Sequence, residues 1–332
     1  MKQLIRTLTE TFSPSGYEHA IRNTIQELIK PYVDEIKVDA MGNLITRKGE
    51  KRNKGKRIMI AAHMDEIGLM ASHVDENGFI RFTGLGSLHP QILFGGRVRF
   101  MNDVHGIIGR EPITDTPQRQ GVNHLFIDVG VKKKKDCPVN AGDVAAFDRP
   151  FVDLGNRLVA KAMDNRVGCA IMIEAMKRIK KSDHEIYFVF TTQEEVGQRG
   201  AVASAFGIDP EIGISLDVTL TGDTPKARKL AVNLGDGPAI KIKGGRMISD
   251  IRIVNWMFRI AEENQIPYQR EILEGGNTDA KAIQVSRSGV PIGCISIPCR
   301  YVHSPSEMID INDVENSTKL LVSLLEDSID LK

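Results

Sequence analysis

The sequence predicts an α/β protein in which a mostly parallel sheet is flanked by helices and a small all-β domain is inserted. Three observations support this prediction. Continuous apolar runs alternate with helical patterns at both ends of the chain, an order typical of a buried parallel sheet. Between about residues 68 and 155, short β-type runs alternate with Gly, Asn, Asp and Pro turns instead. Acidic residues and histidines follow several of the predicted strands.

The first part of the chain is predicted to form two helices, a hairpin and a buried strand. Helical spacing is present in "LIRTLTETF" and "AIRNTIQELIKPYV", and "EIKVDAMGNLITRK" is typical of a hairpin that turns at residues 41–43. The run "KRIMIAAHMDE" is apolar and ends in polar residues, as buried parallel strands do. The predicted insertion follows, with strands in "FIRFTGLG", "RVRFMN", "VHGIIGRE", "HLFIDVG" and "DVAAFDR".

The α/β alternation resumes after about residue 155. Helices are predicted in "NRVGCAIMIEAMKRIKK", "GAVASAFG", "DIRIVNWMFRIAEENQ", "DAKAIQVSRSG" and "DINDVENSTKLLVSLLEDSI". Strands are predicted in "EIYFVFTTQ", "EIGISLDV" and "PIGCISIPC". We therefore expect residues 1–67 and 156–332 to form one domain, whose sheet is covered on both faces, and residues 68–155 to form the insertion.

The composition favours a globular protein without a nucleic-acid or membrane partner. Hydrophobic residues make up 41% of the chain and charged residues 26%, a balance typical of folded domains. The net charge of +1 provides no attraction to a polyanion, and no apolar run approaches the roughly 20 residues that span a bilayer. The N-terminus is too polar for a secretory signal, and the four cysteines show no CxxC spacing. We expect a cytoplasmic protein without a thiolate zinc site.

Two histidines and several carboxylates follow the predicted strands. Open α/β sheets bind ligands outside the carboxyl ends of their strands, so these side chains are expected to meet at one edge. They are His63 and Asp65 after "IMIAA", Asp164 in "KAMDNRVG", Glu194 and Glu195 after "YFVFTTQ", Asp217 in "GISLDV", and His303 in "PCRYVHS".

So many acids cannot share a small space without a cation, because like charges a few ångströms apart force protonation. Imidazole and carboxylate ligands suit zinc, cobalt or manganese. Two histidines with four or more carboxylates exceed the three protein ligands of one catalytic zinc, which favours two ions. Asp65 lies two residues after His63, on the same strand face, and can accept the ring N–H that a metal leaves free.

Each residue also has an ordinary interpretation. Asp164 is at a position to cap the helix that begins near Asn165, and Asp217 is at a position to start a turn. His63 alone is compatible with a buried core histidine, His303 with a surface residue, and the two glutamates with an exposed loop. Taken together, these ordinary interpretations become weaker, because each would have to place an unrelated polar residue at the same edge of the sheet by chance.

Five motifs, in order, resemble a known family. They are "AAHMDEIG", "AMDNRVG", "QEEVGQRGA", "SLDV" and "RYVHSPSE", and they look like those of the M42 family of dinuclear-metal aminopeptidases. These are the tetrahedral-assembly peptidases, whose members are sometimes labelled endoglucanases or cellulases. The resemblance covers essentially the whole chain. It implies a zinc-peptidase-like catalytic domain, a PDZ-like dimerisation insertion, and dimers that build a twelve-subunit hollow tetrahedron.

The resemblance also implies roles for the residues at the sheet edge. His63 and Asp217 would hold one metal ion, Glu195 and His303 the other, and Asp164 would bridge the two. Glu194 would be the general base. Adjacent side chains on an extended segment point apart, so one glutamate can bind metal while the other faces a water whose pKa the ions lower to about 7.

The substrate pocket is less well defined by the sequence. Arg246 in "KGGRMISD" and the loop residues Gly276, Asn277 and Thr278 in "EGGNTDAKA" are candidates to line it, and ordinary surface turns explain them equally well. Asn277 departs from the glycine run that precedes Thr-Asp-Ala in many family members. Asn tolerates a left-handed backbone better than most residues, so the loop shape can survive.

The expected activity is metal-dependent removal of N-terminal residues from short peptides, with two ions of Zn²⁺ or Co²⁺, or alternatively Mn²⁺. Three alternatives remain at this point. A deacylase acting on N-acyl amino acids would use the same metal chemistry. An endoglucanase needs two carboxyls about 5 to 10 Å apart and has no role for the histidines. An assembly protein with a decayed site is disfavoured because every expected ligand and the base are present.

Overall fold

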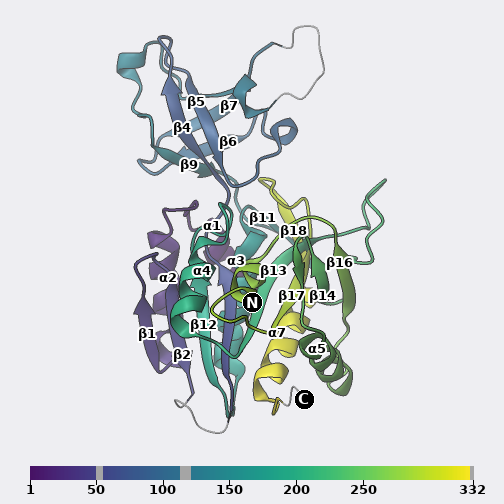
Figure 1. Ribbon diagram of the computed structural model, residues 1–332. Coiled ribbons are helices and arrows are strands. Elements are labelled where there is room, and N and C mark those ends of the chain that lie inside the picture. Colours follow the sequence, from purple (N-terminus) through teal and green to yellow (C-terminus); the bar gives the residue numbers. More distant parts are fainter. Residues whose placement is uncertain (50–54, 113–120, 330–332) are drawn as a thin grey trace.

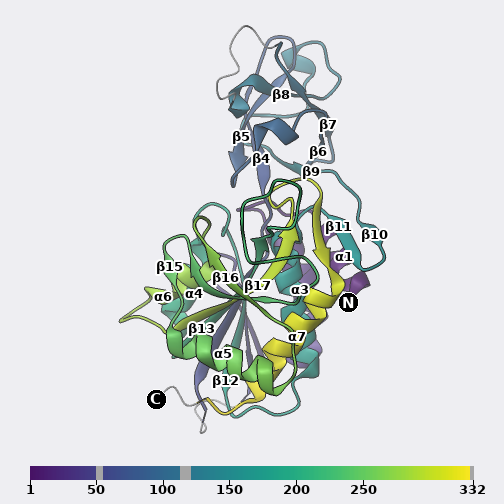
Figure 2. The same cartoon turned by 90° about the vertical axis from the view of Figure 1, so that its right-hand side faces the viewer.

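The computed structural model describes residues 1–49, 55–112 and 121–329. Figure 1 shows a large twisted sheet with helices packed on it and, above it, a separate small barrel that is joined to the larger part through β4 and β9. Figure 2, turned by 90°, shows the strands of the large sheet fanning out beneath the barrel. The predicted combination of a helix-flanked sheet and an all-β insertion is therefore present.

The chain enters the large sheet through two helices and a hairpin. These elements are α1 (Lys2–Glu10), α2 (His19–Ile29), a 3₁₀ turn η1 (Lys30–Tyr32), β1 (Glu35–Val38), β2 (Leu44–Lys48) and β3 (Arg57–His63). β1 and β2 pair antiparallel, which confirms the predicted hairpin. β3 is buried from Ile58 to His63, as its continuous apolar run predicts.

The inserted part is a closed six-stranded barrel. Its strands are β4 (Gly68–Val74), β5 (Ile80–Leu85), β6 (Arg97–Phe100), β7 (His105–Arg110), β8 (Leu125–Asp128) and β9 (Val144–Phe147), with 3₁₀ turns η2 (Pro90–Ile92), η3 (Val122–His124) and η4 (Lys134–Asp136) between them. They close in the order β4-β5-β8-β7-β6-β9. The barrel has its own core, in which Leu69, Val98, Ile108 and Ile127 are fully buried. Because the sheet closes on itself, it leaves no unpaired edge strand.

The chain then returns to the large sheet. The elements are β10 (Val152–Leu154), β11 (Arg157–Ala160), α3 (Met163–Arg178), β12 (Glu185–Thr191), α4 (Arg199–Ile208), β13 (Ile212–Leu220), β14 (Ala239–Gly244), β15 (Met247–Ile248), α5 (Ile251–Glu263), β16 (Gln269–Leu273), α6 (Asp279–Gln284), β17 (Ile292–Arg300), β18 (Glu307–Asp310) and α7 (Ile311–Glu326). α6 ends earlier than the predicted helix, because the backbone turns through positive φ at Arg287 and Gly289. α3 is irregular at its start, where Asp164 and Asn165 have non-helical angles.

The large sheet is mixed, which corrects the prediction of a mostly parallel sheet. Its central strands β12, β3, β13 and β17 pair parallel. Outside this centre, β1-β2, β2-β12, β17-β18, β18-β11 and β11-β10 all pair antiparallel. On a side branch, β14 pairs antiparallel with β17 and parallel with β16. Several of these strands are joined by short connections, and a parallel pair needs a long crossover instead. The edge at which the carboxyl ends of parallel strands bind ligands is therefore formed by the central strands β12, β3, β13 and β17.

Helices cover both faces of this centre. Along β3, Ile58, Ile60 and Ala62 face one core with α1, α2, α3, α5 and α7. Met59 and Ala61 face the opposite core with α4 and α6. This alternation follows from the two-residue period of a strand and confirms the expected two-sided burial. Among the described helices, none is long and apolar enough to cross a bilayer.

Candidate dinuclear metal site

The predicted side chains meet at the carboxyl ends of the central strands. His63 is the last residue of β3 and pairs with Thr191, the last residue of β12. Glu194 and Glu195 follow Thr191 in the next turn, and Asp217 lies near the end of β13. The parallel register therefore places residues from three strands at one level, because parallel strands end on the same side of the sheet.

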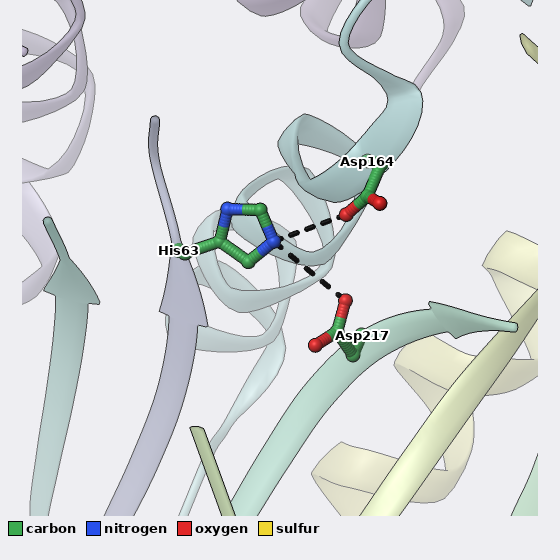
Figure 3. Close-up of side chains that lie close together, drawn as sticks. All are labelled: His63, Asp164 and Asp217. Carbon is green, nitrogen blue, oxygen red and sulfur yellow. Dashed lines mark hydrogen bonds and ion pairs between the residues drawn. The ribbon is translucent and has the colours of Figure 1, made fainter. Parts of the chain in front are cut away.

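One group consists of His63, Asp164 and Asp217, whose ligand atoms lie within 4.8 Å of one another. His63 Nε2 is 3.0 Å from Asp164 Oδ1 and 3.7 Å from Asp217 Oδ1. Figure 3 shows the imidazole of β3 pointing between the two carboxylates, which come from the start of α3 and from β13. All three residues are buried.

A second group consists of Asp164, Glu195 and His303. His303 Nε2 is 3.4 Å from Asp164 Oδ2 and 3.3 Å from Glu195 Oε2. Asp164 thus belongs to both groups, with Oδ1 toward His63 and Oδ2 toward His303. The backbone of Asp164 is non-helical at the start of α3, so its side chain can point toward both histidines and not along the direction that a regular helix would impose.

Charge is strongly unbalanced in this space. Burial opposes the charged form of both imidazoles, but the surrounding carboxylates outweigh it and raise the pKa of His303 to about 11 and that of His63 well above its ordinary value. Burial raises the pKa of Glu195 and Asp217. It also opposes ionisation of Asp164, yet hydrogen bonds from His303 and His63 lower that pKa. The carboxylates therefore create a strong demand for positive charge.

The donor atoms suit divalent cations. Each group offers one imidazole nitrogen and two carboxylate residues, a ligand set used for zinc and similar ions. In addition, Glu195 Oε1 is buried and has no hydrogen-bond partner in the described parts of the chain. An unpaired buried carboxylate oxygen is energetically costly, and coordination to a cation would remove this cost. The residues therefore fit a pair of divalent ions that share Asp164.

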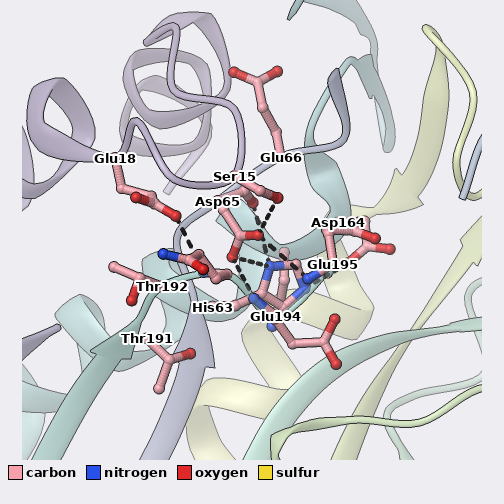
Figure 4. A network of polar contacts seen from close by, with 12 residues as sticks. Ser15, Glu18, His63, Asp65, Glu66, Asp164, Thr191, Thr192, Glu194 and Glu195 are labelled. Carbon is pink, nitrogen blue, oxygen red and sulfur yellow. Dashed lines mark hydrogen bonds and ion pairs between the residues drawn. The ribbon is translucent and has the colours of Figure 1, made fainter. Parts of the chain in front are cut away.

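Asp65 connects the two strand ends, as Figure 4 shows. His63 Nδ1 lies 3.2 Å from the backbone oxygen of Asp65, its hydrogen-bond partner, and 3.4 Å from Asp65 Oδ1. The carboxylate oxygens of Asp65 also accept hydrogen bonds from the backbone N–H groups of Glu194 (3.0 Å) and Glu195 (3.3 Å), and from the Ser15 hydroxyl (2.6 Å). The buried Asp65 carboxylate therefore positions the backbone of both glutamates, while the backbone oxygen of the same residue is the hydrogen-bond partner of the His63 ring.

Glu194 lies beside both groups without belonging to either. Gln198 donates to its Oε1 over 2.8 Å, which holds one of the two carboxylate oxygens. Burial, followed by the charges of Asp217, Asp279 and Glu195, raises the pKa of Glu194 well above its ordinary value. A carboxyl group with a raised pKa is suited to accept and return a proton near neutral pH.

The four residues predicted to line the substrate pocket are divided. Arg246, Gly276 and Asn277 are exposed, and the Gly245 turn lies against the carbonyl of Gly276. Thr278 is buried, caps α6 by accepting from the N–H of Ala280, and contacts Ser215. Thr278 therefore caps α6, while Arg246, Gly276 and Asn277 lie on two adjacent exposed loops.

Several buried charged residues at this edge were not predicted to have a role. Glu307 accepts hydrogen bonds from the backbone of Asp164 and His303. Glu66 pairs with Lys161 over 2.6 Å and lies 3.5 Å from Arg166. Burial raises the pKa of Asp279 to about 7. Glu66 and Glu307 stand within the motifs "AAHMDEIG" and "RYVHSPSE", next to predicted ligands, and this proximity is the signal that the sequence offers for them.

The barrel also reaches the site. The loop after β5 places Gly86 so that an added Cβ would lie 3.1 Å from Glu195 Oε2. Further along this loop, the His89 ring lies 6.4 Å from the His303 ring, measured between centroids. The loop therefore borders the second group, which contains Glu195 and His303.

Comparisons with known proteins agree with this geometry. Residues 42–320 match the family model described as M42 glutamyl aminopeptidase. A relative from Acetivibrio thermocellus, provisionally named an aminopeptidase, is 45% identical over 98% of both chains. Aminopeptidase APDkam598 from Desulfurococcus kamchatkensis has a TM-score of 0.94 and 39% identity, covering 98% of this chain and 94% of that one. The Pyrococcus horikoshii TET1 peptidase, described as assembling into a tetrahedron or a large octahedral shell, has a TM-score of 0.86 and 32% identity, covering 98% of this chain and 99% of that one.

The fold is that of a hydrolase class, the aminopeptidases, and the candidate site lies at the carboxyl ends of the central strands of its large sheet. The chain belongs to the M42 family of aminopeptidases, which hydrolyse peptide bonds. The resemblance drawn from the five sequence motifs is therefore confirmed.

Replacing Gly86 by Ala should impair this site. Gly86 has φ +88°, and a Cβ would come within 2.8 Å of Ile67 Cγ2 and 3.1 Å of Glu195 Cβ. We expect the added methyl group to displace Glu195. This should reduce kcat/KM on an aminoacyl chromogenic substrate by about 10- to 100-fold, the range typical when a group that orients a metal ligand is lost.

Gly130→Ala is the matched control for this prediction. Gly130 also lies in the inserted region at positive φ (+79°), but a Cβ there meets nothing within 4 Å. Both variants should lose about 1–2 kcal/mol of stability from left-handed backbone, measured by thermal unfolding. Equal kcat/KM in the two variants would show that the loop does not support Glu195.

Proposed function

We propose that this protein is a two-metal aminopeptidase that removes N-terminal residues from short peptides. The observation that carries the proposal is that the two oxygens of Asp164 face different histidines: Oδ1 lies 3.0 Å from His63 Nε2, and Oδ2 lies 3.4 Å from His303 Nε2. A carboxylate placed in this way can bridge two ions, which is the arrangement of two-metal hydrolytic sites.

His63 and Asp217 would hold one ion, Glu195 and His303 the other, and Asp164 both. Zn²⁺ or Co²⁺ fits this nitrogen and oxygen donor set, and Mn²⁺ is compatible with it. Ions bound there would supply Lewis-acid polarisation of the scissile carbonyl and a nucleophilic water at neutral pH.

The chain's own residues would perform the proton transfers. Glu194 would take a proton from the attacking water and return it to the departing amine, since its side chain is buried at the site and one oxygen is held by Gln198. Asp65 would keep the His63 ring oriented, since its backbone oxygen and its Oδ1 lie 3.2 Å and 3.4 Å from Nδ1, so that Nε2 faces the ligand position.

The rest of the molecule would select and confine the substrate. Residues 1–67 and 156–332 would form the catalytic domain, and residues 68–155 a PDZ-like dimerisation domain. Arg246, Gly276, Asn277 and Thr278 would border the pocket for the N-terminal side chain, because their loops lie side by side. The likeness to the P. horikoshii peptidase, which is described as assembling into a tetrahedron or a large octahedral shell, supports a homo-oligomer. We propose that it is built from dimers, up to a tetrahedral dodecamer. A cytoplasmic enzyme of this form would act on short peptides that enter the shell.

The test compares a free-amine aminoacyl substrate with its N-acetylated form, before and after chelation and reloading with Zn²⁺, Co²⁺ or Mn²⁺. The expected result is turnover of the free-amine substrate that chelation abolishes and reloading restores. Preference for the acetylated substrate would favour a deacylase. Chelator-resistant cleavage of a cellulose chain would favour an endoglucanase. A panel of different N-terminal residues in the same assay identifies the preferred one.

A further inference from the structure

Glu307 is a buried carboxylate that contacts two of the proposed metal ligands at their backbones. Its Oε1 accepts from the N–H of His303 over 2.8 Å, and its Oε2 accepts from the N–H of Asp164 over 2.9 Å. The residue is 1% exposed. It belongs to neither group of metal-binding side chains, so it is available to support them.

Both contacted segments need such support. His303 has φ +60° although it is not glycine, and Tyr301 two residues earlier has φ +62°, a strained conformation that persists only when neighbours enforce it. Asp164 lies in the non-helical start of α3. Because one carboxylate accepts from both N–H groups, the distance between its two oxygens fixes how far apart the two backbone segments lie.

Glu307 itself is firmly held. It is the first residue of β18 and pairs with Ala160 at the end of β11, shortly before Asp164 in the chain. β18 also pairs with β17, which leads into the loop of His303. Glu307 is therefore attached by the sheet to both of the segments that its side chain joins.

We propose that Glu307 is a positioning residue that sets the geometry of the ion site formed by Asp164, Glu195 and His303. This inference rests on the proposed two-metal function and deepens it. In that site, two of the three ligands are anchored by Glu307, whereas in the site formed by His63, Asp164 and Asp217 only Asp164 is. The effect of losing Glu307 must therefore be unequal between the two ions.

The experiment titrates metal-free full-length protein with Co²⁺ by calorimetry and by visible absorption, and it compares wild type with Glu307→Gln. The amide keeps the volume of the side chain but turns an –NH₂ group toward one of the two N–H donors. We expect one binding step to weaken by about 10- to 100-fold, as for other groups that orient metal ligands, and the other step to change several-fold less. Glu307→Asp, which keeps the charge but shortens the reach, serves the same purpose if the Gln variant does not fold.

Asp313→Asn is the matched control. Asp313 is also fully buried and accepts from two backbone N–H groups, those of Gly235 and Gly237, each over 2.8 Å. It should lose stability without changing either Co²⁺ step. The inference is overturned if Glu307→Gln leaves both steps unchanged, weakens both equally, or behaves like Asp313→Asn. Wild-type protein that binds no Co²⁺ would instead refute the proposed function, so the two failures are distinguishable.

Discussion

Glu194→Gln should lower kcat by about 10²- to 10⁴-fold, the contribution typical of a positioned general base, while both ions remain bound. Glu194 lies outside both groups of candidate ligands, so neutralising it removes the proton acceptor without removing a ligand. The amide has nearly the same size, and Gln198 stays next to it. Metal content, the melting temperature and steady-state kinetics on an aminoacyl substrate measure the three parts of this prediction.

The neighbouring residue provides the control. Glu195 belongs to the second group and has a buried oxygen without a partner in the described chain. Glu195→Gln should therefore reduce metal content, and its activity should recover partly at high Zn²⁺ or Co²⁺ concentration. Glu194→Gln should not recover. Unchanged turnover in Glu194→Gln would remove Glu194 from the proton-transfer role.

Asp164→Asn should have an effect of similar size through a different cause. The carboxylate supplies one oxygen to each group, whereas an amide offers a single oxygen and no charge. Losing the orientation of a ligand already reduces metal affinity or activity by 10- to 100-fold, so losing a ligand of both ions should reduce kcat/KM by at least about 100-fold. The bound metal should fall from two ions per subunit to at most one.

Asp217→Asn separates this effect from general damage to the site. Asp217 belongs to the first group only, and its substitution should weaken one ion while the other is retained. Measurements of metal per subunit on both variants, after equilibration with the same free Zn²⁺ concentration, make the comparison. Two tightly bound ions in Asp164→Asn would contradict a shared ligand.

The sequence predicts the elements whose burial is continuous and the polar residues that follow them. β3, β12, β13 and β17 are long apolar runs; His63 is the last residue of β3, Glu195 follows β12, and Asp217 lies near the end of β13. Because parallel strands in one sheet end at the same edge, the meeting of these residues can be inferred without coordinates. Asp65 lies beyond the last residue of β3, and the hydrogen-bond partner of His63 Nδ1 is its backbone oxygen, a detail that the two-residue period of a strand does not predict.

The remaining features depend on contacts between segments that are distant in the chain. β10, β11 and β18 are short strands at one end of the large sheet, and β11 pairs antiparallel with β18, which is distant from it in the chain. The barrel's closure is set by the pairing of β4 with β9, which no local pattern reveals. Glu307 accepts a hydrogen bond from the backbone of Asp164, and the backbone of Gly86 lies close to the side chain of Glu195; a sequence pattern does not specify such contacts.

Anomalous diffraction from a Zn²⁺-loaded crystal tests the central claim most directly, because it locates each ion independently of activity. The expected result is two peaks in each subunit, one contacted by His63 and Asp217, the other by Glu195 and His303, with one oxygen of Asp164 on each. A single peak that leaves Asp164 bound through one oxygen, or peaks only at other places in the chain, would contradict the account.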